Sequence, residues 1–127
     1  MDLHRIHHVA VICSNYERSK YFYTQVLGLP IVRENYQAHR GGWKLDLRVG
    51  EGAELELFYI PGAPPRLDRP EACGLRHLAF YVPSVREAAA ELKAKGVPCE
   101  PVRVDDYTGK AMTFFRDPDG LPLELHE

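Results

Sequence analysis

Apolar and polar side chains alternate over several short stretches of the chain, a pattern typical of strands with one buried face. One later segment instead has Val85, Ala88, Ala89 and Leu92 at the spacing of an amphipathic helix. Taken with turn and capping residues, the pattern predicts helices at 15–27 and 85–95 and strands at 6–12, 29–34, 43–49, 53–59, 75–82, 97–103, 111–116 and 121–126.

The second half of the chain repeats the first. The segment His8-Val9-Ala10-Val11 returns 69 residues later as His77-Leu78-Ala79-Phe80, and Glu56 corresponds to Glu124 at an offset of 68. Capping boxes also recur, beginning at Ser14 and Ser84. We therefore predict an α+β fold of two tandem βαβββ modules within a single domain spanning 1–127. The modules occupy 4–60 and 73–127, and a proline-rich linker covers 61–72.

Strand parity places a histidine and a glutamate of each module on the same kind of face. Successive side chains of a strand point to opposite faces. In all four strands concerned, the face opposite His8, Glu56, His77 or Glu124 is wholly apolar and suits coverage by a helix. A carboxylate in such a strand is costly to bury unless it is paired or binds a metal. We expect curved half-barrel sheets to converge these four side chains on one metal site.

Two neighbouring residues compete for the ligand roles. His7 could replace His8, but aligning His7 with His77 breaks every later match of the repeat. Glu54 shares the face of Glu56, but its counterpart in the repeat is Pro122. The sequence therefore favours His8 and Glu56. Two imidazoles and two carboxylates suit Ni²⁺, Co²⁺, Zn²⁺ or Mn²⁺, and the ligand types alone do not choose among them.

Composition argues against several other classes of protein. Charged residues make up 27% of the chain, the formal net charge is −2, and no basic run is present, so neither nucleic acid nor an anionic membrane is expected as partner. Three cysteines without C-x-x-C spacing predict neither a disulfide framework nor a zinc knuckle. The first residues lack the apolar core of a signal peptide, which makes a cytoplasmic location the expectation.

The paired His/Glu positions, the His-x-Ala start and the Asp-Pro-Asp-Gly-x-x-x-Glu ending resemble the vicinal oxygen chelate superfamily. That superfamily includes glyoxalase I, extradiol dioxygenases, fosfomycin-resistance transferases, methylmalonyl-CoA epimerase and bleomycin-binding proteins. The chain looks most similar to the YaeR-type branch, through the segments Arg69-Pro70-Glu71-Ala72-Cys73-Gly74-Leu75-Arg76-His77 and Thr113-Phe114-Phe115-Arg116-Asp117-Pro118-Asp119-Gly120-Leu121-Pro122-Leu123-Glu124.

The resemblance implies a glyoxalase-like, metal-dependent lyase or isomerase that abstracts a proton α to a metal-coordinated carbonyl of a small oxo compound. The implied ligands are His8, Glu56, His77 and Glu124, with Glu124 the first choice for the catalytic base and Glu56 the second. Similarity to bacterial glyoxalase I favours Ni²⁺. It also implies a homodimer whose sites take His8 and Glu56 from one subunit and His77 and Glu124 from the other.

The chain departs from the glutathione-using enzymes at two positions. Where those enzymes carry an Arg and an Asn that hold the γ-glutamyl end, this chain has Ile12 and Ile60, so a glutathione hemithioacetal is disfavoured as substrate. Other polar side chains are candidates for substrate contact: Arg40, Lys44, Arg48, Tyr107 and Lys110. Two alternatives stay open, a non-catalytic drug-binding resistance module and an Fe(II) dioxygenase that uses three of the four ligand residues.

Overall fold

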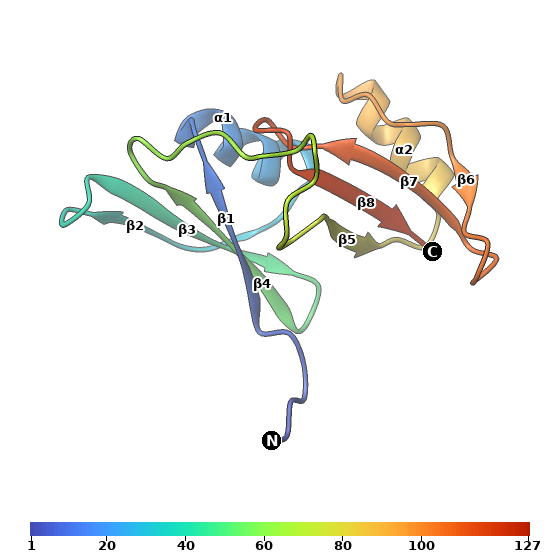
Figure 1. Ribbon diagram of the computed structural model, residues 1–127, viewed down its shortest axis with the longest axis horizontal. Helices are drawn as coiled ribbons and strands as arrows, with labels where there is room; N and C mark the ends of the chain where they lie inside the picture. Colours follow the sequence, from blue (N-terminus) through green and yellow to red (C-terminus); the bar gives the residue numbers. More distant parts are fainter. The chain divides into compact units, whose positions relative to one another are not determined.

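The computed structural model describes residues 1–127, which divide into two compact units, 1–65 and 66–127. The boundary lies within the predicted proline-rich linker. Each unit has one four-stranded mixed sheet, and the strands of each sheet follow the same order of connection (Figure 1). The predicted α+β class with two βαβββ units is confirmed, and both sheets are open rather than closed into a barrel.

The first unit contains β1 (His8–Cys13), α1 (Tyr16–Tyr21), a π-helical turn η1 (Phe22–Val26), β2 (Ile31–Gln37), β3 (Gly42–Val49) and β4 (Ala53–Tyr59). The strand order is β1-β4-β3-β2, with β1 parallel to β4 and the other neighbours antiparallel. Leucines on alternate positions of β3 and β4 are almost fully buried, and the ring of Tyr16 stacks on Trp43 with centroids 5.2 Å apart. The apolar face is thus the helix-covered face, as predicted.

The second unit contains β5 (Leu78–Tyr81), α2 (Val85–Ala94), β6 (Arg103–Val104), β7 (Ala111–Arg116) and β8 (Pro122–His126). Its sheet order is β5-β8-β7-β6, and β5 is parallel to β8. Its core is formed by Val85 and Leu92 of α2 together with Phe115, Leu123 and Leu125 of the sheet. None of the helices in either unit has both the length and the apolar content needed to span a membrane.

The helix starts agree with the sequence to within one residue. Ser84 caps α2, as predicted, and its hydroxyl accepts a hydrogen bond from the amide of Glu87 at 3.3 Å. The first helix is capped by Asn15 instead of Ser14, and the Asn15 side chain accepts from the amide of Arg18 at 3.0 Å. Both residue types cap well, so the pattern alone does not separate them.

Three sequence predictions need correction. The expected strand at 97–103 shrinks to Arg103–Val104, because Pro98 and Pro101 have no amide hydrogen to donate to the neighbouring strand. The expected strand at 75–82 begins only at Leu78. The linker is also more than a spacer, since Asp68 forms an ion pair with Arg116 at 2.9 Å and ties the segment to the second unit.

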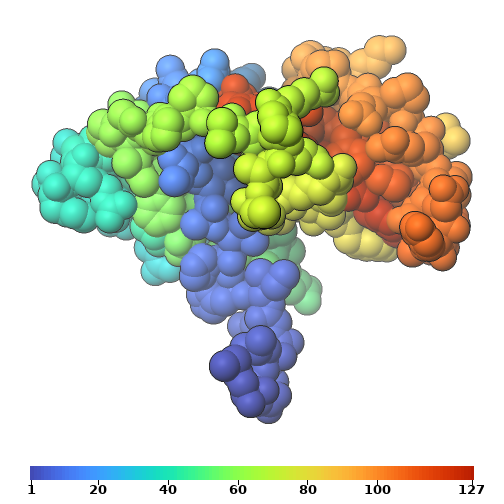
Figure 2. All heavy atoms as spheres, viewed as in Figure 1, coloured from blue at the N-terminus to red at the C-terminus, as the bar shows by residue number.

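The first residues of the chain and the start of β1 differ in how they pack. Residues 1–6 are exposed and lie away from the sheet, where they form the dark blue projection of Figure 2. His7 and His8 mark the point at which the chain joins the sheet, since β1 begins at His8 and the carbonyl of His7 accepts a hydrogen bond from the amide of Glu54 at 3.0 Å. The sheet therefore fixes the backbone on which the first predicted ligand is carried.

Candidate metal and substrate site

The first unit brings His8 and Glu56 together. In the parallel pairing of β1 with β4, Ala10 lies opposite Glu56 and His8 lies two residues earlier on the same face. The Nε2 atom of His8 is 3.8 Å from Oε2 of Glu56. The other ring nitrogen of His8, Nδ1, is 2.9 Å from Nδ1 of His7. His8 thus directs one nitrogen at the glutamate while His7 contacts the other.

A charged network on the same face holds Glu56 in place. The Lys44 ammonium lies 2.9 Å from Oε1 of Glu56 and 2.7 Å from Oδ1 of Asp46, and Arg33 pairs with the other oxygen of Asp46. Burial alone would raise the pKa of Asp46, but hydrogen bonds from Lys44 and Arg33 outweigh it and hold that pKa below the ordinary value. Asp46 is 1% exposed and stays ionised, so it anchors Lys44 against Glu56.

The second unit brings His77 and Glu124 together. The Nε2 atom of His77 lies 2.9 Å from Oε2 of Glu124. Glu124 is paired between Ala79 of β5 and Phe114 of β7, and it is only 6% exposed although it lies on the face opposite the core. The ring of His77 meets the edge of Phe114 with centroids 5.1 Å apart. Strand pairing and an aromatic neighbour therefore fix both members of this pair.

The contact with Arg76 favours one tautomer of His77. The Nη1 atom of Arg76 lies 3.3 Å from Nδ1 of His77, and a guanidinium can only donate, so Nδ1 accepts. A neutral His77 then carries its proton on Nε2 and donates it to Glu124. To bind a cation through Nε2, the ring must move that proton to Nδ1, which requires the contact with Arg76 to break.

The two pairs fit a divalent cation as half-sites. Adjacent ligands of a six-coordinate ion at about 2.1 Å lie about 3 Å apart, close to the separation of His77 and Glu124 and somewhat below that of His8 and Glu56. Nitrogen and carboxylate oxygen donors together suit first-row divalent metals. Neither unit by itself holds a third His, Cys, Asp or Glu placed to complete a site. Each unit thus holds one imidazole beside one carboxylate.

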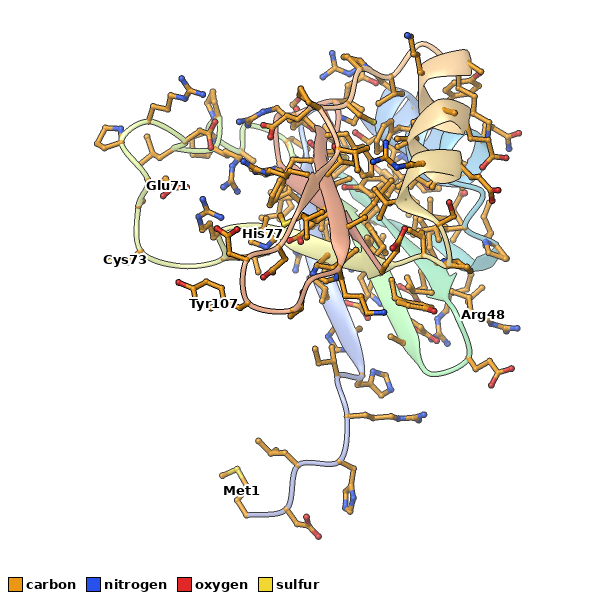
Figure 3. The ribbon with its side chains drawn as sticks, turned by 90° about the vertical axis from the view of Figure 1, so that its right-hand side faces the viewer. Met1, Arg48, Glu71, Cys73, His77 and Tyr107 are labelled. Atoms are coloured by element: carbon orange, nitrogen blue, oxygen red, sulfur yellow. The ribbon has the colours of Figure 1, made fainter.

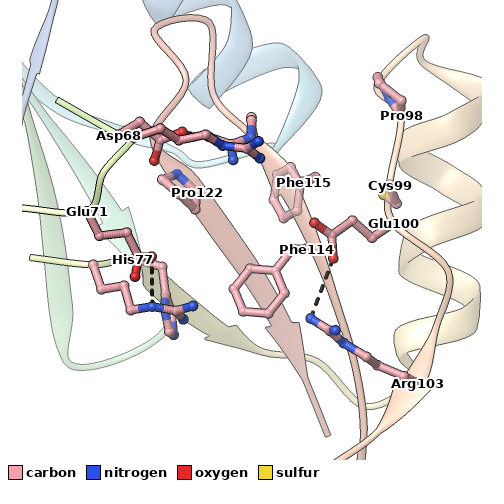
Figure 4. A pocket seen from close by; sticks show the side chains of 13 residues that line it. Asp68, Glu71, His77, Pro98, Cys99, Glu100, Arg103, Phe114, Phe115 and Pro122 are labelled. Carbon is pink, nitrogen blue, oxygen red and sulfur yellow. Dashed lines mark hydrogen bonds and ion pairs between the residues drawn. The ribbon is translucent and has the colours of Figure 1, made fainter. Parts of the chain in front are cut away.

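A pocket of about 560 Å³ opens beside His77, and all of its lining residues belong to the second unit (Figure 4). Phe114, Phe115 and Pro122 form its apolar floor, and several arginines and acidic residues stand around it. Its polar lining comprises His77 with Arg69, Arg76, Arg103, Arg116, Asp68, Glu71 and Glu100. Such a volume suits a small organic molecule.

None of the residues predicted to contact substrate lines this pocket. Lys44 is the one that touches a predicted ligand, Glu56. Arg48 lines a smaller hollow of about 140 Å³ near Glu54, and Tyr107 is fully exposed on the loop before β7 (Figure 3). Arg40 lies in the turn between β2 and β3 against His39, and Lys110 ends the exposed loop that carries Tyr107.

The sequence reading missed several residues that the structure places beside the predicted ligands. Asp46 shares the strand parity of Lys44, which was the available signal for its position, but its burial was not foreseen. Arg76 lies outside β5, which begins at Leu78, and it is exposed at the pocket. No pattern in the sequence indicated that Arg103 lies at the pocket.

Comparison with known proteins assigns the chain to a superfamily. The Glyoxalase/Bleomycin resistance protein/Dioxygenase superfamily matches residues 5–125. YwkD of Bacillus subtilis is 54% identical over 100% of this chain and 99% of that protein, and YaeR of Escherichia coli is 50% identical over 100% and 98%. A solved structure of a glyoxalase family protein from Enterococcus faecalis is 54% identical, covers 97% of each chain and has a TM-score of 0.90.

More distant relatives carry names of enzymes. A 2-epi-5-epi-valiolone epimerase of Actinomyces sp is 32% identical over 94% of this chain and 77% of that protein. A probable lactoylglutathione lyase of Vibrio cholerae is 32% identical over 98% and 91%.

Proposed function

The chain belongs to the glyoxalase/bleomycin resistance/dioxygenase superfamily and resembles its YaeR-type members, and from its site we propose that it is a metal-dependent lyase or isomerase. The substrate is a small oxo or hydroxycarbonyl compound. The reaction moves a proton on the carbon next to a carbonyl group.

The observation that carries this proposal is the recurrence of one donor pair in both units. His8 begins β1 and His77 directly precedes β5, and each lies close to a glutamate of the strand paired with it, Glu56 of β4 and Glu124 of β8. A single such pair is common in proteins and needs no metal. Two equivalent pairs on sheets of the same topology supply the four donors that one divalent cation requires.

A divalent cation bound by these residues would polarise the substrate carbonyl and so acidify the neighbouring carbon–hydrogen bond. We favour Ni²⁺ among Ni²⁺, Zn²⁺, Co²⁺ and Mn²⁺, all of which accept mixed nitrogen and oxygen donors.

The surroundings of the two glutamates suggest different roles for them. Glu56 contacts the Lys44 ammonium at 2.9 Å, which restrains its movement. Glu124 contacts the imidazole of His77, and its strand neighbours are Ala79 and Phe114. Glu124 is therefore the carboxylate better able to take the proton from the substrate carbon and return it. Glu56 serves as the fixed ligand.

Two of the enzyme relatives fit this class by name, one as an epimerase and one as a probable lactoylglutathione lyase. The cosubstrate of the second does not transfer readily to this chain. Ile12 stands 54% exposed on the same face as His8 and offers no group to hold a carboxylate. We propose that the substrate of this protein is not a glutathione adduct.

We further propose that the protein works as a homodimer, with His8 and Glu56 of one subunit and His77 and Glu124 of the other completing each site. Neither unit alone contains three suitable donors. The faces that carry the donors also leave Ile12 54% and Tyr81 78% exposed, and apolar side chains of this size favour burial against a partner.

Solvent deuterium exchange tests the reaction class. The Ni²⁺-loaded protein is incubated in D₂O with dihydroxyacetone, lactaldehyde, and methylglyoxal mixed with glutathione or cysteine, and label entering beside the carbonyl is followed by NMR. We expect exchange with at least one compound. Glu124→Gln should lower its rate by a factor of about 100 or more, because the variant loses a carboxylate that serves both as metal ligand and as base.

Three outcomes would count against the proposal. Exchange that survives complete chelation excludes a metal-assisted reaction, and full exchange in Glu124→Gln excludes that residue as base. Oxygen consumption by Fe²⁺-loaded protein with a catechol, without deuterium exchange, would instead indicate a dioxygenase.

A further inference from the structure

We propose that the substrate carries an anionic group at the end opposite its carbonyl, and that Arg103 binds this group across the ring of Phe114. The placing of the carbonyl end beside His77 rests on the function proposed above. The binding of the anionic group by Arg103 rests on the pocket of the second unit alone.

Phe114 lies between the histidine and the arginine. The ring of His77 meets Phe114 with centroids 5.1 Å apart, and the Arg103 guanidinium carbon lies 5.6 Å from the centre of the same ring. The close-up shows the three side chains in this order along the pocket, with Pro122 beside them (Figure 4). The pairing of Arg103 with Met112 of β7 fixes this order, because Phe114 lies two residues further along the same face.

The arginines around the pocket differ in how firmly they are held. Arg116 donates through Nη1 to Asp68 at 2.9 Å and to the carbonyl of Gly120 at 2.8 Å, so this guanidinium is held at two points. Arg76 pairs with Glu71 at 3.0 Å and also contacts His77.

Arg103 is held more loosely. Its partner Glu100 lies 3.5 Å away, both side chains are more than half exposed, and exposed pairs of this kind contribute little. Its guanidinium retains donors in the planar fork that matches a carboxylate or phosphate. Stacking on Phe114 orients that fork without consuming its donors.

The pocket therefore sets a substrate class. One end of the molecule presents oxygen atoms beside His77, the middle is planar or apolar enough to lie on Phe114, and the far end is a carboxylate or phosphate. A volume of about 560 Å³ accommodates such a molecule with room for water. Glu100 adds a negative charge at the same end and weakens binding of the anion when Arg103 is paired with it.

A matched pair of chelating probes tests this inference. Benzohydroxamate and 4-carboxybenzohydroxamate bind divalent metals through the same group and differ only by a distal carboxylate. Their dissociation constants are measured by calorimetry on the Ni²⁺-loaded full chain. We expect the carboxylate to tighten binding by about tenfold, the size of one charge-assisted hydrogen bond. Arg103→Met should remove this advantage, and Glu100→Gln should increase it several-fold.

Arg86→Met, on the exposed side of α2, removes an equal charge away from the pocket and should leave both constants unchanged. Unchanged Ni²⁺ content shows that each variant is folded and loaded. Equal affinity for the two probes in the unaltered protein would overturn the anion site while leaving the metal proposal intact.

If the protein holds none of Ni²⁺, Zn²⁺, Co²⁺ and Mn²⁺, the proposed function fails, and the anion site is then tested separately by NMR titration with benzoate. Binding that depends on Arg103 would keep the anion site, and no binding would overturn it as well.

Discussion

The ammonium group of Lys44 lies 2.9 Å from one oxygen of Glu56, and the other oxygen of that carboxylate faces His8. The same ammonium lies 2.7 Å from Asp46, which is almost fully buried. Lys44 thus joins the predicted metal ligand of the first unit to a buried anion behind it. This link has a measurable consequence for stability.

Replacing Lys44 with Met leaves Asp46 buried with Arg33 as its remaining charged partner. We expect the free energy of unfolding in urea to fall by about 2–3 kcal/mol, because a buried carboxylate loses one of its two compensating charges. Lys20→Met is the matched control. Lys20 pairs with Glu34 in a more exposed setting, and its loss should cost less than about 1 kcal/mol. Equal losses in the two variants would show that Asp46 does not depend on Lys44.

Arg76→Met tests the tautomer of His77. The contact of Arg76 with Nδ1 favours the ring form in which Nε2 carries the proton and does not bind metal. Removing the arginine should therefore raise the affinity for Co²⁺ by more than removing a like charge elsewhere. Arg116→Met supplies that comparison, since Arg116 lines the same pocket but pairs with Asp68. Competition with a metal indicator measures both variants, and an identical gain in the two would refute a role for the tautomer.

Tyr16 should make the protein less stable in alkali. Burial first, and then the charge of Glu34, raise its pKa well above 10 in the folded state, so folding favours the neutral phenol. The contribution is complete below the pKa of the unfolded chain, near 10, and is lost as the pH rises above it.

Urea titrations between pH 9 and 12 should show this as a difference between the unaltered protein and Tyr16→Phe. Above pH 10 the difference in free energy of unfolding between the two proteins should change by up to about 1.4 kcal/mol per pH unit in favour of the variant. Tyr107→Phe removes a fully exposed phenol and should track the unaltered protein throughout. A gap that does not change with pH would mean that Tyr16 ionises freely in the fold.

The sequence was sufficient for the fold and for pairing the ligands within each unit. Alternation at β3, β4 and β8 and the internal repeat can be read directly from the sequence, which is why the buried leucines lie as predicted. Each histidine lies close to the glutamate of its own unit, while convergence of all four on one metal stays a prediction. Glu124 lies opposite Ala79 in the parallel pairing of β5 and β8, and His77 directly precedes β5, so the two side chains lie next to each other.

Other features depend on contacts that periodicity does not encode. The burial of Asp46 depends on two cations, Lys44 on its own strand and Arg33 on the neighbouring β2. The pocket position of Asp68 arises from its pair with Arg116. The shortened β6 follows from Pro98 and Pro101, whose effect on strand pairing could have been foreseen. The role of Arg103 depends on that short strand and was not accessible to a parity argument.

The central claim is that one cation is held by a donor pair from each unit. Metal content after saturation with Ni²⁺ and dialysis measures this for the unaltered protein and for His8→Ala, Glu56→Gln, His77→Ala and Glu124→Gln. We expect about one ion per chain in the unaltered protein and a clear loss in all four variants, whichever unit carries the change. Full occupancy in the His8 and Glu56 variants, with loss confined to His77 and Glu124, would contradict a site built from both units.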